Sequence, residues 1–326
     1  MKQNGPNYFK MNRIFKFIGY FLAALFVGIV VLLASFYESD VPLADLKPKY
    51  ISDKSQFVSV LGMQVHVRDE GPKSDSIPLV LLHGMSSSLN TWDEVVKSVA
   101  GRRRTISVDL PGFGMTGPNP KNQYNFVFYN EFIDSLCLKL GVQKFTLVGN
   151  SMGGAIAWNY EITHPGRLDK LVLIDAVGYP QTKEKGSLGF LIASTPVINN
   201  LLLYFTPKVL VRKSLETIYF DQNLVTDAQV ERFHDIVVRE GNRAAALEIF
   251  KGSFGKPLGK TNQVKTPTLI LWGEFDYLID VSNADRFNQD IQGSKKVIFS
   301  NVGHVPMEEV PGKIADELMN FVGAIK

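Results

Sequence analysis

The stretch that decides the fold is 144–154, which reads KFTLVGNSMGG. Its first half, KFTLV, is a short apolar run of the kind found in strands that are buried on both faces of a sheet. Its second half opens a segment of helical length. Side chains at Gly149 and Gly153 would collide with the neighbouring strand and helix if the turn between them is tight. The pattern therefore predicts a strand, a sharp turn and a helix, with the hydroxyl of Ser151 projecting from the turn.

Similar apolar runs alternate with helical stretches over 56–178 and again over 266–326. The expected strands cover 57–61, 63–68, 78–82, 105–110, 144–148, 170–174, 266–271 and 296–299. The expected helices lie at 91–100, 125–140, 151–164, 282–291 and 312–322. This alternation predicts an α/β fold with a mostly parallel, eight-stranded sheet and helices on both faces. The first two strands are joined by a tight turn, which indicates an antiparallel start.

The alternation breaks over 179–265, where no buried strand pattern occurs. Helical patterns at 226–240 and 243–254 lie there, together with apolar stretches at 188–192 and 197–205. An insertion of this length, about 85 residues, is too long for a connection between two strands. We expect a helical cap over the carboxyl edge of the sheet, where open α/β sheets bind ligands. The core of the fold then consists of 56–178 and 266–326.

An apolar run without charged side chains, FIGYFLAALFVGIVVLLASF, occupies 17–36. Twenty helical residues span about 30 Å, the thickness of the hydrocarbon core of a bilayer. Basic residues lie in the preceding segment, 1–16, and acidic residues follow in a linker, 37–55. The positive-inside rule predicts a single-pass signal anchor, with a cytoplasmic N-terminus and the large domain on the periplasmic or extracytoplasmic side. A cleaved signal peptide is the alternative, although its apolar region would be shorter.

Composition narrows the classes of protein and of partner. The 326 residues are 45% hydrophobic and 21% charged, with 35 Lys and Arg against 32 Asp and Glu, which is typical of a globular protein and argues against a nucleic-acid partner. The single cysteine, Cys137, excludes an intramolecular disulfide and a cysteine-based metal cluster. The sequence has no P-loop or dinucleotide fingerprint, so we expect no cofactor and no metal.

Two segments carry the residue types of an activated serine. Ser151 is the central residue of a G-x-S-x-G motif in a strand–turn–helix setting, which a nucleophile elbow requires. His304 follows the last expected strand, and an imidazole there can take the proton of a hydroxyl group. We expect structural roles for three other histidines: His66, His164 and His234. The sequence therefore predicts that His304 is the base for Ser151.

A third segment supplies a carboxylate that can orient this base. Asp276 follows the strand expected at 266–271, and the order Ser, Asp, His is that of an α/β-hydrolase triad. Asp280 and Glu274 lie close by in the sequence, and Asp175 follows another expected strand. We expect Asp276 to be the orienting carboxylate, with the other three as alternatives.

From about residue 57 to its end, the chain resembles the α/β-hydrolase superfamily in its capped, single-sheet form. The motifs that carry the resemblance are His83-Gly84, Trp92, Asp109-Leu-Pro-Gly-Phe-Gly114, Gly149–Gly154, Trp272-Gly-Glu-Phe-Asp276 and Gly303-His-Val-Pro-Met-Glu-Glu309. The chain is similar to bacterial membrane-associated esterases and lipases and to mammalian membrane-anchored monoacylglycerol lipases. It shares the GNSMGG elbow with the C–C bond hydrolases of aromatic degradation. The resemblance implies an oxyanion hole formed by the backbone N–H groups of Met85 and Met152.

These observations predict a membrane-anchored serine hydrolase, in the first place a carboxylic-ester hydrolase of the esterase or lipase type. Its expected partners are a small-molecule or lipid-derived ester and the membrane. The alternatives are a meta-cleavage C–C bond hydrolase, a haloperoxidase- or acyltransferase-like activity on the same triad, and a non-catalytic binding protein. The loop after His83-Gly84 reads MSSS and lacks the glycine run of the C–C hydrolases. Serine at position 151, where epoxide hydrolases and dehalogenases have aspartate, disfavours those two chemistries.

Overall fold

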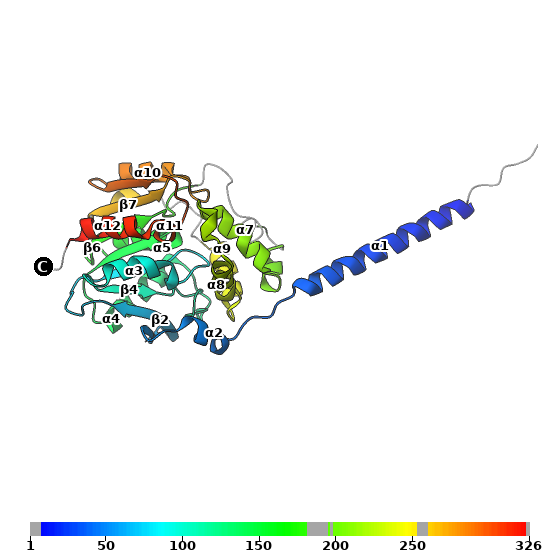
Figure 1. Ribbon diagram of the computed structural model, residues 1–326, viewed down its shortest axis with the longest axis horizontal. Helices are drawn as coiled ribbons and strands as arrows, with labels where there is room; N and C mark the ends of the chain where they lie inside the picture. The colour runs from blue at the N-terminus through cyan, green and yellow to red at the C-terminus, as the bar shows by residue number, and fades with distance from the viewer. Residues whose placement is uncertain (1–7, 181–194, 196–197, 253–259, 324–326) are drawn as a thin grey trace, which may run out of the picture.

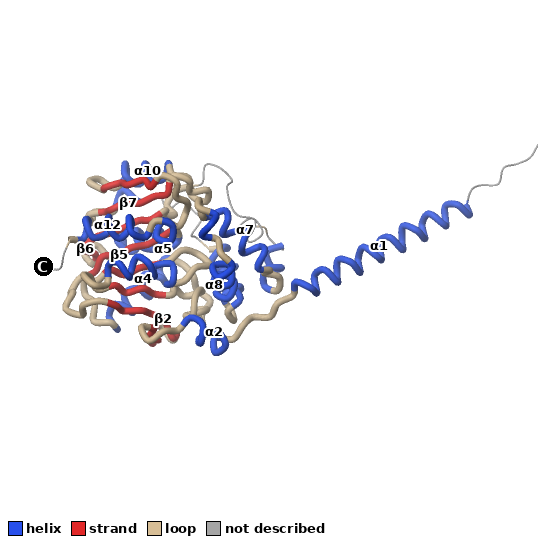
Figure 2. Tube along the Cα trace, viewed as in Figure 1, coloured by secondary structure: helices blue, strands red, loops and turns tan. Residues whose placement is uncertain are grey.

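Eight strands form one sheet in the order β1-β2-β4-β3-β5-β6-β7-β8 (Figures 1 and 2). The computed structural model describes residues 8–180, 195, 198–252 and 260–323. The strands are β1 (Ser55–Val60), β2 (Met63–Glu70), β3 (Leu79–Leu82), β4 (Thr105–Val108), β5 (Phe145–Asn150), β6 (Leu168–Ile174), β7 (Thr268–Gly273) and β8 (Lys295–Phe299). β2 runs antiparallel to both of its neighbours, and all other pairs are parallel. The predicted eight-stranded, mostly parallel sheet with an antiparallel start is confirmed.

Helices cover both faces of the sheet and bury two separate hydrophobic cores. One face carries α4 (Phe126–Lys139), α5 (Met152–Thr163) and α10 (Ser282–Asp290), whose apolar side chains pack in one cluster with alternate residues of the strands. The other face carries α3 (Asp93–Val99) and α12 (Pro311–Val322), which pack against each other and against the second cluster. Strands β3 to β7 are mostly apolar and almost wholly buried because both of their faces are covered.

A group of helices stands between β6 and β7. It comprises η2 (Ile198–Leu203), α7 (Lys208–Ile218), η3 (Gln222–Leu224), α8 (Asp227–Val238) and α9 (Asn242–Lys251), followed by η5 (Thr261–Gln263). Contacts place these helices over the carboxyl ends of the strands, because the His304 N–H donates to the carbonyl of Ile218 at 2.7 Å and a Cβ at Gly112 would meet Ile249. Within the cap predicted at 179–265, residues 181–194, 196–197 and 253–259 lie outside the described residues, as does the apolar stretch at 188–192.

The N-terminal helix α1 (Tyr8–Phe36) begins earlier than the expected anchor at 17–36. Its segment Ile14–Phe36 contains an 18-residue window with a mean hydropathy of 2.7 and is long and apolar enough to cross a membrane. Figure 1 shows α1 extending away from the sheet on the side where α7 and α8 lie, opposite the C-terminus.

The segment expected as a linker, 37–55, is bound to the rest of the protein. Backbone bonds join Val41 to Val238 at 2.8 Å and Glu240 to Val41 at 2.9 Å. The carboxylate of Asp40 accepts hydrogen bonds from the Gly241 N–H at 2.9 Å and from Arg243 Nε at 2.8 Å. We refer to 37–41 as the strap.

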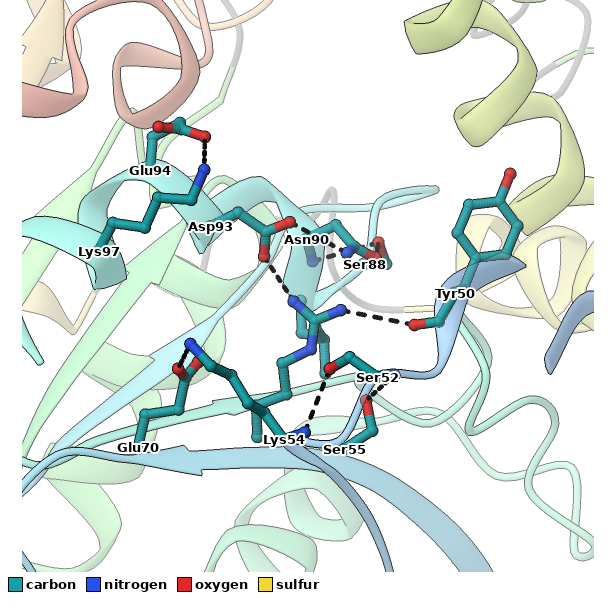
Figure 3. A network of polar contacts seen from close by, with 12 residues as sticks. Tyr50, Ser52, Lys54, Ser55, Glu70, Ser88, Asn90, Asp93, Glu94 and Lys97 are labelled. Carbon is teal, nitrogen blue, oxygen red and sulfur yellow. Dashed lines mark hydrogen bonds and ion pairs between the residues drawn. The ribbon is translucent and has the colours of Figure 1, made fainter. Parts of the chain in front are cut away.

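The helix that follows the strap, α2 (Leu43–Tyr50), is tied to the sheet. Arg68 donates to Asp93 in α3 at 2.7 Å and to the carbonyl of Tyr50 at 3.5 Å (Figure 3). This helix was not predicted, because eight residues with a proline and a low mean hydropathy show no clear periodicity.

Candidate active site

Ser151 stands on a strained turn between β5 and α5. Its backbone has φ 54° and ψ −116°, a conformation that residues with a side chain seldom adopt. A Cβ at Gly149 would lie 2.3 Å from the carbonyl oxygen of Gly153, and one at Gly153 would lie 2.5 Å from the carbonyl oxygen of Leu82. The predicted need for glycine at both positions is confirmed. The turn leaves Ser151 partly exposed at the first turn of α5.

His304 and Asp276 form a buried pair, which we refer to as the site pair. Nδ1 of His304 lies 2.7 Å from Oδ2 of Asp276. Oδ1 of Asp276 accepts hydrogen bonds from the N–H groups of Leu278 and Ile279, at 2.8 and 2.9 Å. An ionised carboxylate only accepts hydrogen bonds, so Nδ1 carries the proton and Nε2 of the neutral ring is left as the acceptor. An imidazole in this tautomer can take a proton at Nε2.

Hydrogen bonds between loops place the site pair beside the serine turn. The N–H of Phe275 donates to the carbonyl of Val302 at 2.9 Å, which joins the loops that follow β7 and β8. The side-chain amide of Asn150, the residue before Ser151, donates to the carbonyl of His304 at 3.2 Å. Since β5 and β7 end at the same edge of a parallel sheet, these bonds bring residues 151, 276 and 304 into one region.

The loop after β3 passes directly beside the serine. A Cβ at Gly84 would lie 3.1 Å from the Cβ of Ser151. Nδ1 of His83 donates to the carbonyl of Gly84 at 2.6 Å, and its Nε2 accepts from the N–H of Leu110 at 3.0 Å. Burial lowers the pKa of His83 and so favours the neutral ring that these two bonds require. His83 therefore fixes the backbone of the loop that carries Met85, and Met152 is the first residue of α5, where an N–H group has no acceptor within the helix.

The alternative carboxylates occupy different surroundings. Glu274 is exposed, and Oδ1 of Asp280 accepts a hydrogen bond from the N–H of Ser282 ahead of α10. Asp175 is fully buried, and one of its carboxylate oxygens lies within 4.8 Å of the corresponding oxygen of Asp276 and a ring nitrogen of His304. The side chains of Asp175, Asp276 and His304 have oxygen and nitrogen atoms that could bind a metal ion. However, the 2.7 Å separation in the site pair is that of a direct hydrogen bond, so both of its atoms are already engaged.

Two glutamates after His304 hold the inserted helices to the site, and the sequence analysis assigned no role to them. Glu308, in α11 (Pro306–Glu309), is partly buried and accepts hydrogen bonds from Arg232 and Tyr219, at 2.8 and 2.7 Å. Burial would raise the pKa of Glu308, but Arg232 and its hydrogen bonds lower it below its usual range. Glu309 accepts from the N–H groups of Gly303 and Phe220. Their carboxylates connect α7 and α8 to the loop of His304.

Sheet order, elbow and insertion together identify the architecture. A family model described as the α/β hydrolase fold matches residues 77–194. The chain has the α/β-hydrolase fold. Among curated relatives of this hydrolase, the monoacylglycerol lipase ABHD6 of Bos taurus is 28% identical over 285 residues, covering 81% of this chain and 84% of the relative.

Two further matches represent different reactions. The 2-hydroxy-6-oxo-2,4-heptadienoate hydrolase of Pseudomonas putida is 28% identical over 264 residues, covering 78% of this chain and 91% of the relative. A crystal structure of a bacterial membrane phospholipase A superposes with a TM-score of 0.72 and 25% identity, covering 95% of this chain and 98% of the other. These matches support a hydrolase of the lipase and esterase type, with C–C bond hydrolysis represented among its relatives.

Proposed function

We propose that this hydrolase cleaves carboxylic esters with Ser151 as the nucleophile, His304 as the base and Asp276 as the orienting carboxylate. The observation that carries the proposal is the site pair, held at 2.7 Å in the loops beside the strained turn of Ser151. A serine hydroxyl becomes a nucleophile only when a base takes its proton, and the tautomer of His304 leaves Nε2 for that purpose.

The proposed reaction proceeds in two halves. His304 takes the proton of Ser151 as Oγ attacks the ester carbonyl, and the N–H groups of Met85 and Met152 bind the oxyanion. His304 then gives this proton to the leaving alcohol, and an acyl-enzyme remains on Ser151. Water attacks the acyl-enzyme with His304 again as the base, and the acid is released as Oγ takes back the proton.

We further propose a lipid-derived substrate and a membrane-anchored enzyme. The lipase relatives and α1 support the substrate class and the anchor. In the proposed topology, the basic residues before the apolar run 17–36 remain in the cytoplasm, and the sheet lies on the periplasmic or extracytoplasmic side. A reporter that is fluorescent only after cytoplasmic folding, fused after residue 326, should stay dark. A bright fusion would reverse this orientation.

The strap is short, which supports placing the inserted helices close to the membrane surface. Residues 37–40 can span at most about 14 Å, and Val41 is already hydrogen-bonded to Val238. The ring of Tyr37 stacks on that of Tyr204, with centroids 6.3 Å apart, and Val209 in α7 is exposed. We therefore propose that the α7 side of the protein rests at the surface of the bilayer that α1 enters.

A fluorophore at the surface of α7 tests this arrangement. Val209→Cys and Leu138→Cys both replace an exposed apolar residue, and Leu138 stands at the far end of α4. The native thiol does not interfere, because burial of Cys137 raises its pKa to about 12. In vesicles containing the full chain, lipid-borne quenchers should quench a label at 209 and spare one at 138. Equal quenching at both positions would contradict the proposal.

One observation favours a second candidate, C–C bond hydrolysis. The Pseudomonas putida relative named above is a 2-hydroxy-6-oxo-2,4-heptadienoate hydrolase, and it is as similar as the lipase relative. The deciding experiment offers the purified enzyme p-nitrophenyl esters of increasing chain length and, separately, a dienone substrate of the meta-cleavage type. We expect ester turnover that Ser151→Ala abolishes and little dienone turnover. Dienone turnover without ester turnover would select the second candidate.

A further inference from the structure

Asp175 is a buried carboxyl group that the proposed reaction does not use. It follows β6 directly, and its φ of 45° is in the left-handed region, which aspartate tolerates better than most residues. Its N–H donates to the carbonyl of Leu271 at 3.1 Å, and its Oδ1 accepts from the N–H of Gly273 at 3.0 Å. Both bonds turn the carboxyl group toward the end of β7. Among the described residues, Oδ2 has no donor.

The neighbours of Asp175 determine which carboxyl group carries a proton. One carboxylate oxygen of Asp175 lies within 4.8 Å of one of Asp276, and two buried carboxylates this close cannot both ionise without a large electrostatic cost. Asp276 accepts three hydrogen bonds, including one from His304, whereas Asp175 accepts one. Burial raises the pKa of Asp175 well above its usual range, and the charges of Asp276 and Glu309 raise it further.

We propose that Asp175 is a neutral carboxylic acid whose Oδ2–H group donates a hydrogen bond to the carboxylate of Asp276. This donation accounts for the oxygen of Asp175 that has no donor of its own. It also makes Asp175 a positioning residue, because the carboxylate that orients His304 is itself held by a donor from β6. The inference rests on the proposed function only in so far as it assigns Asp276 to the triad.

The hydrogen bond has a consequence for the base. A donor to Asp276 stabilises the carboxylate and weakens its attraction for the proton of His304. The charged or titratable groups that face Asp175 are Asp276 from the loop after β7, His304 from the loop after β8 and Glu309 from α11. The donor therefore allows His304 to lose its second proton, and so to act as a base, at lower pH than it would beside an unsupported carboxylate.

The first experiment reads the protonation state without using activity. Asp175→Asn keeps a donor and cannot titrate. In the proposal, the folded wild-type chain keeps a proton on Asp175, whereas the unfolded chain releases it above a pH of about 4. The wild-type chain therefore loses stability relative to Asp175→Asn as the pH rises. The difference in unfolding midpoint between Asp175→Asn and the wild-type chain should therefore widen in favour of the variant from about pH 4 to pH 7. A constant or narrowing difference would overturn the proposal.

The second experiment reads the positioning role from the pH dependence of kcat/KM for an ester. Activity is expected to fall on the acid side of this pH profile, and Asp175→Asn, which keeps a donor, should leave the position of that fall unchanged. Asp175→Gly suits the left-handed backbone but has no donor, so it should move the fall to higher pH by roughly half to one unit. An acid limb that both variants leave unchanged would reduce Asp175 to a structural residue. A downward shift in Asp175→Asn would show that the wild-type group is charged. If the wild-type chain hydrolyses no ester, the proposed function fails and the first experiment still decides this inference.

Discussion

Two buried histidine–aspartate pairs in this hydrolase have the same contact but different surroundings. In the site pair, Nδ1 of His304 lies 2.7 Å from Oδ2 of Asp276. In a second pair, which we refer to as the structural pair, Nδ1 of His66 lies 2.7 Å from Oδ2 of Asp109. All four side chains are buried. The contact alone therefore does not distinguish a triad from a structural tie.

The structural pair also has a serine. Nε2 of His66 lies 2.9 Å from Oγ of Ser55, which completes a Ser–His–Asp chain of hydrogen bonds. The hydroxyl of Ser55 accepts from the N–H of Ser52 in a turn at the start of β1 (Figure 3). The carboxylate of Asp109 accepts from the N–H groups of Leu89 and Met115, so it joins three segments of the fold.

The difference lies in the backbone around each serine. Ser151 stands on a turn with φ 54°, at the N-terminus of α5 and beside the loop of Met85. Ser55 is the first residue of a strand. A nucleophile needs an exposed hydroxyl and donors aimed at the oxyanion, which a strained turn before a helix supplies and a regular strand does not. The four predictions below test this comparison.

Loss of either serine hydroxyl should give the largest contrast. Ser151→Ala removes the proposed nucleophile and should lower kcat/KM for p-nitrophenyl esters by on the order of 10³-fold or more. Ser55→Ala should leave kcat/KM within about threefold, because its hydroxyl joins His66 to the turn before β1 and has no role in the proposed reaction. Steady-state kinetics on both purified variants measure this. A Ser151→Ala enzyme with near-normal rates would remove the site pair from catalysis.

Loss of either imidazole should separate activity from stability. His66→Ala leaves Asp109 buried without its partner and should lower the free energy of unfolding by about 3 kcal/mol. His304→Ala should abolish turnover, because it removes the proposed base, whatever it costs in stability. Denaturant unfolding gives the free energy of unfolding of both variants, and an ester assay gives their turnover. The comparison fails if His66→Ala, though folded, also loses its turnover.

The serine turn should be intolerant of a methyl group. Gly153→Ala would place a Cβ 2.5 Å from the carbonyl oxygen of Leu82 and should cost roughly 1–3 kcal/mol and displace Ser151. Gly312→Ala is the matched control, since its Cβ would meet no atom within 4 Å and its backbone is helical. Thermal unfolding and turnover should both fall for the first variant only. If Gly153→Ala and Gly312→Ala have equal stability and equal turnover, the serine turn must be able to shift and accept the methyl group.

The structural pair should contribute to acid sensitivity. Burial alone would raise the pKa of Asp109, but His66, His83 and the N–H of Leu89 together outweigh burial and hold this pKa below its usual range. A group with a lowered pKa stabilises the fold above its unfolded pKa, about 4, and loses that contribution as the pH falls further. Asp109→Asn should therefore flatten the loss of stability below about pH 4 while lowering stability at neutral pH. An unchanged slope in acid would show that other carboxyl groups dominate.

The sequence predicted features that depend on local patterns. The eight strands were predictable because strands covered on both faces are apolar, as in β5, and the serine turn was predictable because its glycines are required by backbone contacts. The meeting of the loops at 276 and 304 follows from β7 and β8 being parallel neighbours.

Other features depend on contacts between distant residues. The strap reaches Arg243 across about two hundred positions, and no periodicity in 37–41 indicates this. Asp175 was one of several candidate carboxylates, and it lies close to Asp276 only because β6 pairs with β7. Helix α7 was not predicted, although its buried residues Val211 and Leu215 have the four-residue spacing of one helix face.

Labelling with a fluorophosphonate probe tests the central claim most directly, because the probe reacts with activated serines regardless of the natural ester. The full chain in detergent is treated with the probe as wild type, Ser151→Ala and Ser55→Ala. We predict that the wild type and Ser55→Ala are labelled and that Ser151→Ala is not. Labelling that persists in Ser151→Ala, or that disappears in Ser55→Ala, would contradict the assignment of the site pair as the base of this hydrolase.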